Sequence, residues 1–180
     1  MEVEKTKIEG LLLIKPTEFN DERGFFLETF NAEKYQNIIG DTIFVQDNMS
    51  MSKKNVLRGI HFQKNPAAQG KLVQVINGEV LDVAVDLRRK SPTYGLYQSF
   101  VLNNKNKHQL WIPEGLGHAF LSKKEDTILS YKCSNYYSSQ NEATILWNDP
   151  QINIDWGISD PILSEKDKEG VLLKDMITCF

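Results

Sequence analysis

Residues 71–87, KLVQVINGEVLDVAVDL, limit how this chain can fold more than any other segment. Two runs of strand-forming residues flank the dipeptide Asn77-Gly78. Asn-Gly favours a type I′ turn, because both of its residues tolerate a positive φ. The segment therefore predicts a β-hairpin.

The second of these runs has two different faces, because successive strand residues point to opposite sides. One face holds Leu81, Val83, Val85 and Leu87, and the other holds Val80, Asp82, Ala84 and Asp86. The first is a packing face. The second has two carboxylates among small residues, which is typical of the inner wall of a polar cavity.

Further short runs with strand character follow at close spacing, separated by clusters rich in Asn, Asp, Pro and Ser. The expected strands cover residues 11–15, 25–30, 44–51, 56–62, 97–102, 109–112, 119–121 and 127–131. A helix is expected only at 32–39, with a turn or two within 166–175. Many short strands predict an all-β sandwich or barrel, and the lack of a repeat or linker predicts one domain over 1–180. A small barrel with a wide mouth offers an internal ligand cavity.

Charge and composition exclude several classes of protein. Lys and Arg number 21 against 24 Asp and Glu, a net charge of −3, which argues against a general nucleic-acid binder. The N-terminus has no apolar signal region, and the longest apolar runs are too short to span a bilayer. The two cysteines, Cys133 and Cys179, make no disulfide framework. We expect a soluble cytoplasmic protein with neither a nucleic acid nor a membrane as partner.

The chain has three histidines, which are the first candidates for acid–base chemistry. His108 follows the polar turn NNKNK and is expected at the surface. His61 lies on an expected strand, where Arg58 would point to the opposite face unless Gly59 permits a bulge. His118 is expected in a loop that leads back into a strand.

Metal binding is not expected, because the chain has no His-x-His pair, and His61 and His118 would have to recruit Asp82 or a glutamate. Two further candidates have more than one interpretation. Lys71 is either a solvated strand end or a cation for an oxyanion or phosphate, and Tyr131 is either a core residue or a proton donor. Residues 164–167, Ser-Glu-Lys-Asp, have the composition of an exposed charged turn.

Taken together, several motifs resemble one family. The sequence is similar to the dTDP-4-dehydrorhamnose 3,5-epimerases, nucleotide-sugar epimerases of the cupin (jelly-roll) superfamily. The matching stretches are DERGFFLETFN (21–31), FVQDNMS (44–50), VLRGIHFQ (56–63), QGKLVQVINGEVLDVAVDLRRKSPTYG (69–95), LWIPEGLGHAF (110–120), YKCSNYY (131–137), LWNDP (146–150) and ILSEKD (162–167). They run from about residue 10 to about residue 170, in the family's order. The resemblance implies a cupin barrel and epimerisation next to a ketone, with no cofactor and no metal.

The resemblance also implies catalytic roles. His61, in RGxHF, corresponds to the base that removes a proton α to the carbonyl, and Asp167 corresponds to its partner carboxylate. Lys71 corresponds to the cation that stabilises the enolate oxygen. Tyr131 corresponds to the acid that returns a proton to the opposite face.

The nucleotide-binding residues follow in the same way. Arg58 resembles the family's pyrophosphate-binding arginine, a role that suits a planar guanidinium. Positions that line the base and ribose pocket are matched by Arg23, Phe26, Glu28, Gln46 and Asn48. Part of that pocket comes from the partner subunit in this family, which implies a homodimer. Asp82 and His118 match a second pair, expected to contact the substrate or to support residues that do.

The implied reaction is epimerisation at C3 and C5 of dTDP-4-dehydro-6-deoxy-D-glucose, giving dTDP-4-dehydro-L-rhamnose for L-rhamnose biosynthesis. The alternatives are a C3-only or C5-only epimerase, a non-catalytic sugar-nucleotide-binding cupin, and a metal-dependent cupin. The segment GLGHAF (115–120) departs from the family, where a phenylalanine and reversed small residues surround the histidine. This departure is expected to alter the cavity wall and to leave the catalytic groups in place.

Overall fold

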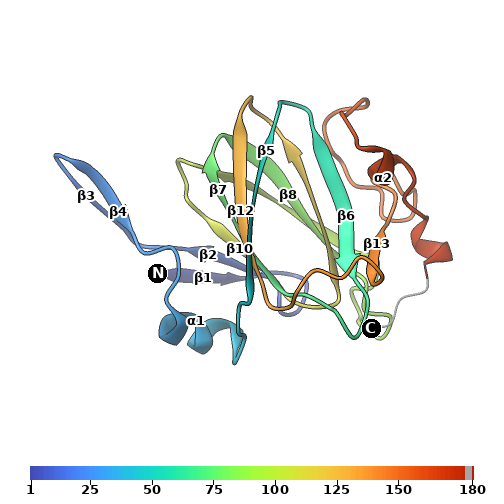
Figure 1. The fold of residues 1–180 in the computed structure, drawn as a ribbon, viewed down its shortest axis with the longest axis horizontal. Coiled ribbons are helices and arrows are strands. Elements are labelled where there is room, and N and C mark those ends of the chain that lie inside the picture. Colours follow the sequence, from blue (N-terminus) through green and yellow to red (C-terminus); the bar gives the residue numbers. More distant parts are fainter. Residues whose placement is uncertain (177–179) are drawn as a thin grey trace.

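The protein is built from two antiparallel β-sheets that face each other, as the computed structural model, which describes residues 1–176 and 180, shows (Figure 1). The first sheet has the order β1 (Glu2–Lys5), β2 (Leu12–Lys15), β10 (Gln109–Ile112), β7 (Lys71–Asn77), β12 (Thr127–Cys133), β5 (Gln46–Ser52). The second has the order β13 (Glu142–Thr144), β6 (Leu57–Gln63), β11 (Leu116–Ser122), β8 (Glu79–Asp86), β9 (Tyr97–Asn103). The expected all-β class is confirmed.

Three smaller elements lie outside these sheets. The hairpin β3 (Glu18–Asp21) and β4 (Gly24–Leu27) projects away from the barrel, at the left of Figure 1. Helix α1 (Ala32–Ile39) begins where it was expected, because Asn31 caps it by accepting a hydrogen bond from the Lys34 N–H at 3.2 Å. A short helix α2 (Glu165–Lys168) and a 3₁₀ turn (Leu173–Asp175) lie near β6 and β13. No helix in the described part of the chain is long and apolar enough to cross a membrane.

The two faces of β8 enter two different cores, as the alternation along this strand predicts. Val80 and Ala84 pack inside the barrel, in a cluster with residues of β7, β10 and β12. Val83 and Val85 pack on the other side of the sheet, against the C-terminal segment and Trp156. The second sheet is therefore buried on both faces, against an apolar cluster inside the barrel and a second cluster outside it.

The hairpin predicted around Asn77-Gly78 is wrong. Strand β7 belongs to the first sheet and β8 to the second, so the two strands do not pair. Gly78 has a φ of +83°, and a Cβ there would lie 2.4 Å from Thr127 Oγ1. A glycine is required here because the chain passes from one sheet to the other with a positive φ and close to Thr127. The local sequence of such a connection is the same as that of a hairpin turn.

The remaining strands agree with expectation in position, although their ends differ. Strand β11 is longer than expected, and the expected strand at 25–30 ends at Leu27. Strands β1, β3 and β13 were not predicted, because their sequences are polar and show no alternation. The turn between β3 and β4 consists of Glu22 and Arg23, since Asp21 pairs with Gly24.

Candidate active site

A cavity of about 300 Å³ lies between the two sheets and is lined from both of them. Its lining residues are Gln46, Asn48, His61, Phe62, Gln63, Gln69, Lys71, Tyr131, Cys133, Tyr137 and Glu142. Five residues singled out from the sequence are thus brought together: His61, Lys71, Tyr131, Gln46 and Asn48. They come from the consecutive strands β5, β6 and β7 and from the distant strand β12.

A bulge in β6 places His61 in this cavity. His118 of β11 pairs with His61, and Phe120 pairs with Arg58. The two pairs are two residues apart on β11 and three residues apart on β6, so β6 contains one extra residue. Because residues 118 and 120 share a face, Arg58 and His61 also lie on the same side. Gly59 permits the bulge with a φ of +124°, and a Cβ there would lie 2.6 Å from the His118 carbonyl oxygen. The bulge considered from the sequence is confirmed.

His61 and Asp167 form a hydrogen-bonded dyad. His61 Nε2 lies 2.6 Å from Asp167 Oδ1, which also accepts a hydrogen bond from the Gly59 N–H at 3.2 Å. The other carboxylate oxygen accepts a hydrogen bond from Ser164 Oγ at 2.6 Å. The expected exposed turn at 164–167 is therefore wrong for Asp167, which is 2% exposed. Ser164 caps α2 through the Asp167 N–H, and this single helical turn directs the aspartate inward while Glu165 and Lys166 face solvent.

The electrostatics of the dyad fix the state of His61. Burial would raise the pKa of Asp167, but hydrogen bonds from His61 and Ser164 outweigh it and hold the pKa below its ordinary value. Burial lowers the pKa of His61, and the bond to Asp167 opposes this only in part. The imidazole is therefore neutral at pH 7, with its proton on Nε2 toward the ionised carboxylate. This tautomer leaves the Nδ1 lone pair free to accept a proton.

Lys71 and Tyr131 supply a cation and a phenol. Burial lowers the pKa of Lys71, and no hydrogen bond or ion pair holds its Nζ within the described residues. The Nζ lies 6.0 Å from the centroid of the Tyr131 ring. Burial raises the pKa of Tyr131, so its hydroxyl keeps its proton and can only donate at neutral pH.

A second buried pair, His118 and Asp82, lies beside the dyad. His118 is in the middle of β11, not in a loop as expected, and its Nε2 lies 3.0 Å from both oxygens of Asp82. It is the strand partner of His61. Asp86, expected on the same polar wall as Asp82, instead lies at the end of β8, where it accepts hydrogen bonds from the loop that follows. His108 is half-buried and does not line the cavity.

The predicted nucleotide-binding residues divide into two groups. Arg58 lies at the edge of β5, where it donates to Ser52 Oγ at 3.1 Å and to the Met51 carbonyl at 3.2 Å. Gln46 and Asn48 belong to the same group, and both line the cavity. The remaining three, Arg23, Phe26 and Glu28, are on or beside the projecting hairpin and do not line the cavity of their own chain. Arg23 pairs with Asp21 and is 85% exposed, Phe26 is 69% exposed, and Glu28 pairs with Lys34 at 2.7 Å.

Sequence reasoning missed a polar group at the cavity mouth. The Tyr137 hydroxyl donates to Glu142 Oε2 at 3.1 Å, and Lys166 forms an ion pair with the same carboxylate. Glu142 reaches the cavity because β13 pairs with β6, which places it opposite Gln63. Its polar surroundings give no strand signal, so only the tertiary pairing locates it. Cys133 also lines the cavity, whereas Cys179 lies outside the described residues.

No group of three or more His, Cys, Asp or Glu side chains that could hold a metal ion occurs among residues 1–176 and 180. The GLGHAF departure lies in the packed wall. Leu116 belongs to the barrel core, and a Cβ at Gly117 would lie 2.5 Å from Ile60 Cγ2. Neither residue lines the cavity.

Two facing antiparallel sheets around a His–Asp dyad, a desolvated lysine and a tyrosine define a cupin-type enzyme equipped for proton transfer. Comparison with known proteins narrows the class. The family model for dTDP-4-dehydrorhamnose 3,5-epimerase matches residues 5–175, and the chain belongs to this family. It is accordingly a carbohydrate epimerase, an isomerase that acts as a dTDP-4-dehydrorhamnose 3,5-epimerase.

Three relatives illustrate the likeness. The dTDP-4-dehydrorhamnose 3,5-epimerase of Salmonella typhimurium is 51% identical, over 96% of each chain. The dTDP-6-deoxy-D-glucose-3,5-epimerase of Legionella pneumophila, solved in complex with dTDP-4-keto-L-rhamnose, has a TM-score of 0.94 at 44% identity and covers 98% of this chain and 94% of its own. A 3′-monoepimerase from Streptomyces bikiniensis, in complex with dTDP-quinovose, has a TM-score of 0.89 at 33% identity and covers 94% of this chain and 86% of its own.

Proposed function

We propose that the cavity epimerises dTDP-4-dehydro-6-deoxy-D-glucose at C3 and C5 through enolate intermediates, without a cofactor, and releases dTDP-4-dehydro-L-rhamnose. One observation carries this proposal. A base dyad, a lysine cation with no partner among residues 1–176 and 180, and a protonated phenol surround a single cavity. The relative from Legionella pneumophila, solved with dTDP-4-keto-L-rhamnose, supports the choice of sugar.

Each inversion uses the same three groups. His61 Nδ1 takes the proton from the carbon next to the ketone, and Asp167 stabilises the imidazolium that forms. The electron pair of the broken C–H bond moves into the ring and places negative charge on the ketone oxygen. Lys71 stabilises this charge, because its ammonium is desolvated and has no hydrogen-bond or ion-pair partner in the described part of the chain. Tyr131 donates a proton to the opposite face of the same carbon, which inverts it.

Residues at the rim of the cavity are expected to bind the nucleotide. Arg58 is positioned for the pyrophosphate, since its guanidinium reaches from β6 to β5, the edge strand of the other sheet. Gln46 and Asn48 face inward from β5, next to it. His118 and Asp82, the buried pair beside the dyad, are expected to contact the sugar or to support the residues that do.

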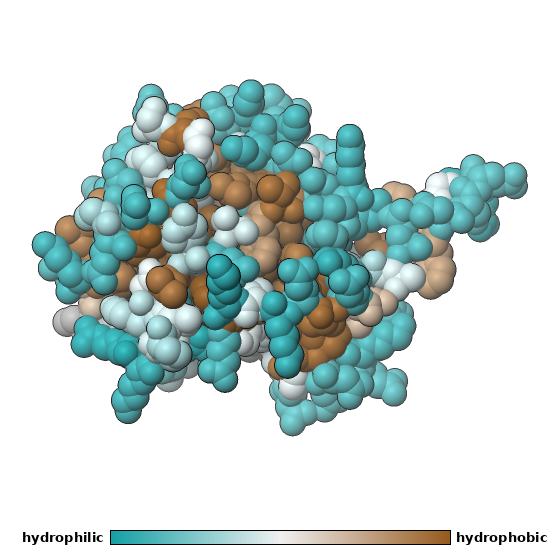
Figure 2. All heavy atoms as spheres, turned by 180° about the vertical axis from the view of Figure 1, so that it is seen from behind, coloured by the Kyte–Doolittle hydropathy of each residue, from teal (hydrophilic) through white to brown (hydrophobic). Residues whose placement is uncertain are grey.

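The position of the hairpin supports our proposal of a homodimer. Arg23, Phe26 and Glu28 match nucleotide-binding positions, yet they project from the body of their own chain (Figure 1). In the space-filling view from behind, the hairpin stands clear of the molecule at one side (Figure 2). An exposed aromatic arm of this kind is costly in a monomer. We infer that the arm reaches the cavity of a second copy and completes its base and ribose pocket.

A cytoplasmic location is part of the same proposal. Cys133 is a free, buried thiol that lines the cavity. A thiol held reduced beside the site suits a reducing compartment.

The test is proton exchange with dTDP-4-keto-6-deoxyglucose in deuterium oxide, followed by NMR. Deuterium at both C3 and C5 is the expected result. Label at a single carbon would identify a single-site epimerase such as the 3′-monoepimerase relative, and label at neither carbon would refute the assignment.

A further inference from the structure

One side chain of the barrel links it to the projecting hairpin. The Lys107 ammonium forms an ion pair with Glu18 of β3 and lies 4.2 Å from the centroid of the Phe25 ring of β4. Glu18 also accepts a hydrogen bond from Asn20 at 2.8 Å, so the carboxylate is oriented from within the hairpin. Among the residues described, no other ion pair joins the hairpin to the rest of the chain.

The barrel holds Lys107 in a rigid turn between β9 and β10. The Asn103 side-chain oxygen accepts hydrogen bonds from the N–H groups of Lys105 and Asn106, at 3.0 and 2.8 Å. The Asn106 side-chain oxygen accepts hydrogen bonds from the N–H groups of Asn103 and His108, both at 3.1 Å. Lys107 itself has a φ of +53°, and its side chain is only 18% exposed. The turn therefore fixes the backbone from which the Lys107 side chain extends, independently of the hairpin.

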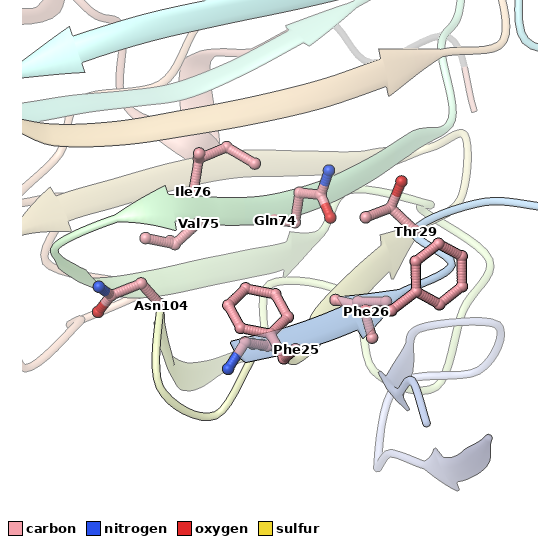
Figure 3. Close-up of a pocket in the computed structure, with 9 residues that line it drawn as sticks. Phe25, Phe26, Thr29, Gln74, Val75, Ile76 and Asn104 are labelled. Carbon is pink, nitrogen blue, oxygen red and sulfur yellow. The ribbon is translucent and has the colours of Figure 1, made fainter. Parts of the chain in front are cut away.

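The rest of the junction between hairpin and barrel is hollow. A pocket of about 350 Å³ separates Phe25 and Phe26 from Gln74, Val75 and Ile76 of β7, with Asn104 at its rim (Figure 3). Hydrophobic packing across this gap is incomplete, so it does not fix the angle of the hairpin. Lys107 lines the same pocket and bridges it.

We propose that Lys107 is a positioning residue that sets the angle at which the β3–β4 arm leaves the barrel and thereby tunes nucleotide binding in the partner's site. The inference rests on the proposed exchange of arms in a homodimer. An arm that is ordered in advance loses less conformational entropy when it closes on the nucleotide. Lys107 touches no group that takes part in proton transfer, so its effect falls on substrate binding and not on turnover.

The variant Lys107→Ala separates these effects. KM for the dTDP-sugar is expected to rise ~3- to 30-fold, the range for losing one partly exposed ion pair and one cation–π contact, with kcat within about twofold of wild type. Lys107→Arg keeps both contacts and is expected to restore most of the affinity. Lys105→Ala is the matched control, since Lys105 is an exposed lysine of the same turn that contributes only its backbone to the bonds described. The thermal midpoint of each variant shows whether the barrel is intact.

A double-mutant cycle with Glu18→Gln supplies a check that does not disturb the turn. Glu18→Gln alone is expected to raise KM, and the double variant is expected to raise it by less than the product of the two single effects. A KM unchanged in Lys107→Ala, or multiplicative effects in the cycle, would overturn the inference.

Arg23→Ala distinguishes this failure from failure of the proposed function. If Arg23→Ala raises KM while Lys107→Ala does not, the arm works without Lys107 and only the positioning role is lost. If Arg23→Ala also leaves KM unchanged, the arm does not reach a site, and both the arm exchange and the inference fall.

Discussion

Tyr131 and His61 lie in the same cavity, and both are neutral at pH 7, but they are suited to opposite roles in proton transfer. Burial keeps the proton on the tyrosine and keeps the histidine neutral. A neutral imidazole that accepts and a phenol that donates are the two groups an inversion needs, one for each face of the carbon. Their separate roles can be tested by removing one hydroxyl.

Tyr131→Phe is expected to lose epimerised product far more than it loses deuterium uptake. His61, Asp167 and Lys71 can still form the enolate, but the proton then returns from the starting face, which gives exchange without inversion. NMR in deuterium oxide measures both quantities in one sample. Equal loss of both would mean that Tyr131 acts in binding or in enolate formation.

His61→Asn is the matched comparison, because it removes the base and leaves the cavity wall in place. Uptake and product are expected to fall together, by at least ~10²–10⁴-fold. Exchange at the wild-type rate would move the base elsewhere, with His118 the first candidate.

The dyad also sets how activity depends on pH. Catalysis requires neutral His61, so kcat/KM falls on the acid side of the pKa of His61, which burial places below its ordinary value of 6.5. Asp167 favours the protonated imidazole and so raises this pKa. Asp167→Asn is therefore expected to move the acid limb to lower pH while it decreases kcat. A pH profile of kcat/KM measures the shift, and an acid limb that moves upward would contradict the proposed interaction.

Local features such as a β-bulge, a helix cap and a buried carboxylate position the secondary-structure elements. The bulge at Gly59 turns β6 so that Arg58 and His61 share a side, and the cap at Ser164 turns Asp167 inward. The loop after β8 depends on Asp86, which is fully buried and accepts hydrogen bonds from Arg88 at 2.9 Å and from Ser91 and Thr93 at 2.6 Å. These polar partners compensate for the burial of the carboxylate.

Asp86→Asn is expected to destabilise the fold in a pH-dependent way. Burial alone would raise the pKa of Asp86, but the bonds from Arg88, Ser91 and Thr93 lower it from 3.8 to about 2. A depressed pKa stabilises the folded state fully above the unfolded value, and this stabilisation is lost as the pH falls from 3.8 toward about 2. The variant should lose about 2 kcal/mol of unfolding free energy at neutral pH.

Urea denaturation of both proteins, at neutral pH and near pH 3, measures this effect. The difference between them should shrink on acidification. Asp160→Asn, at an exposed position, is expected to change stability by less than ~0.5 kcal/mol. A loss for Asp86→Asn that stays constant with pH would indicate packing rather than charge.

At the scale of the whole molecule, one chain carries the catalytic groups and an arm that cannot reach them. The double variant Arg23→Ala/Phe26→Ala keeps the cavity and disables the arm, and His61→Asn does the reverse. Each homodimer is expected to be inactive at subsaturating substrate. When equal amounts are unfolded and refolded together, mixed dimers should recover about a quarter of wild-type activity, because each contains one intact cavity and one intact arm.

Recovery in the mixture, compared with each variant refolded alone, distinguishes arm exchange from sites that are complete within one chain. If each arm served the cavity of its own chain, one chain of a mixed dimer would lack a working arm and the other would lack its base, and no activity would return. Analytical ultracentrifugation of the wild type checks the dimer directly.

The sequence by itself determined the features that depend on neighbours along the chain. Alternation in residues 80–87 identified a strand with one packing face and one face toward the interior, and a helix was expected over the residues of α1. The motifs around His61, Lys71 and Tyr131 identified the family. These signals are local because side-chain periodicity and capping act over a few residues.

Only the tertiary structure decided which segments meet. The sequence Asn77-Gly78 is compatible both with a hairpin between β7 and β8 and with a crossover of β8 to the other sheet. The sequence around Asp167 predicts a surface residue, and only the structure places it against His61, 106 positions away. Glu142 reaches the cavity only because β13 pairs with β6. These positions are set by long-range strand pairing and burial, whose free energy depends on the whole barrel. A segment of a few residues therefore does not show which strands will pair.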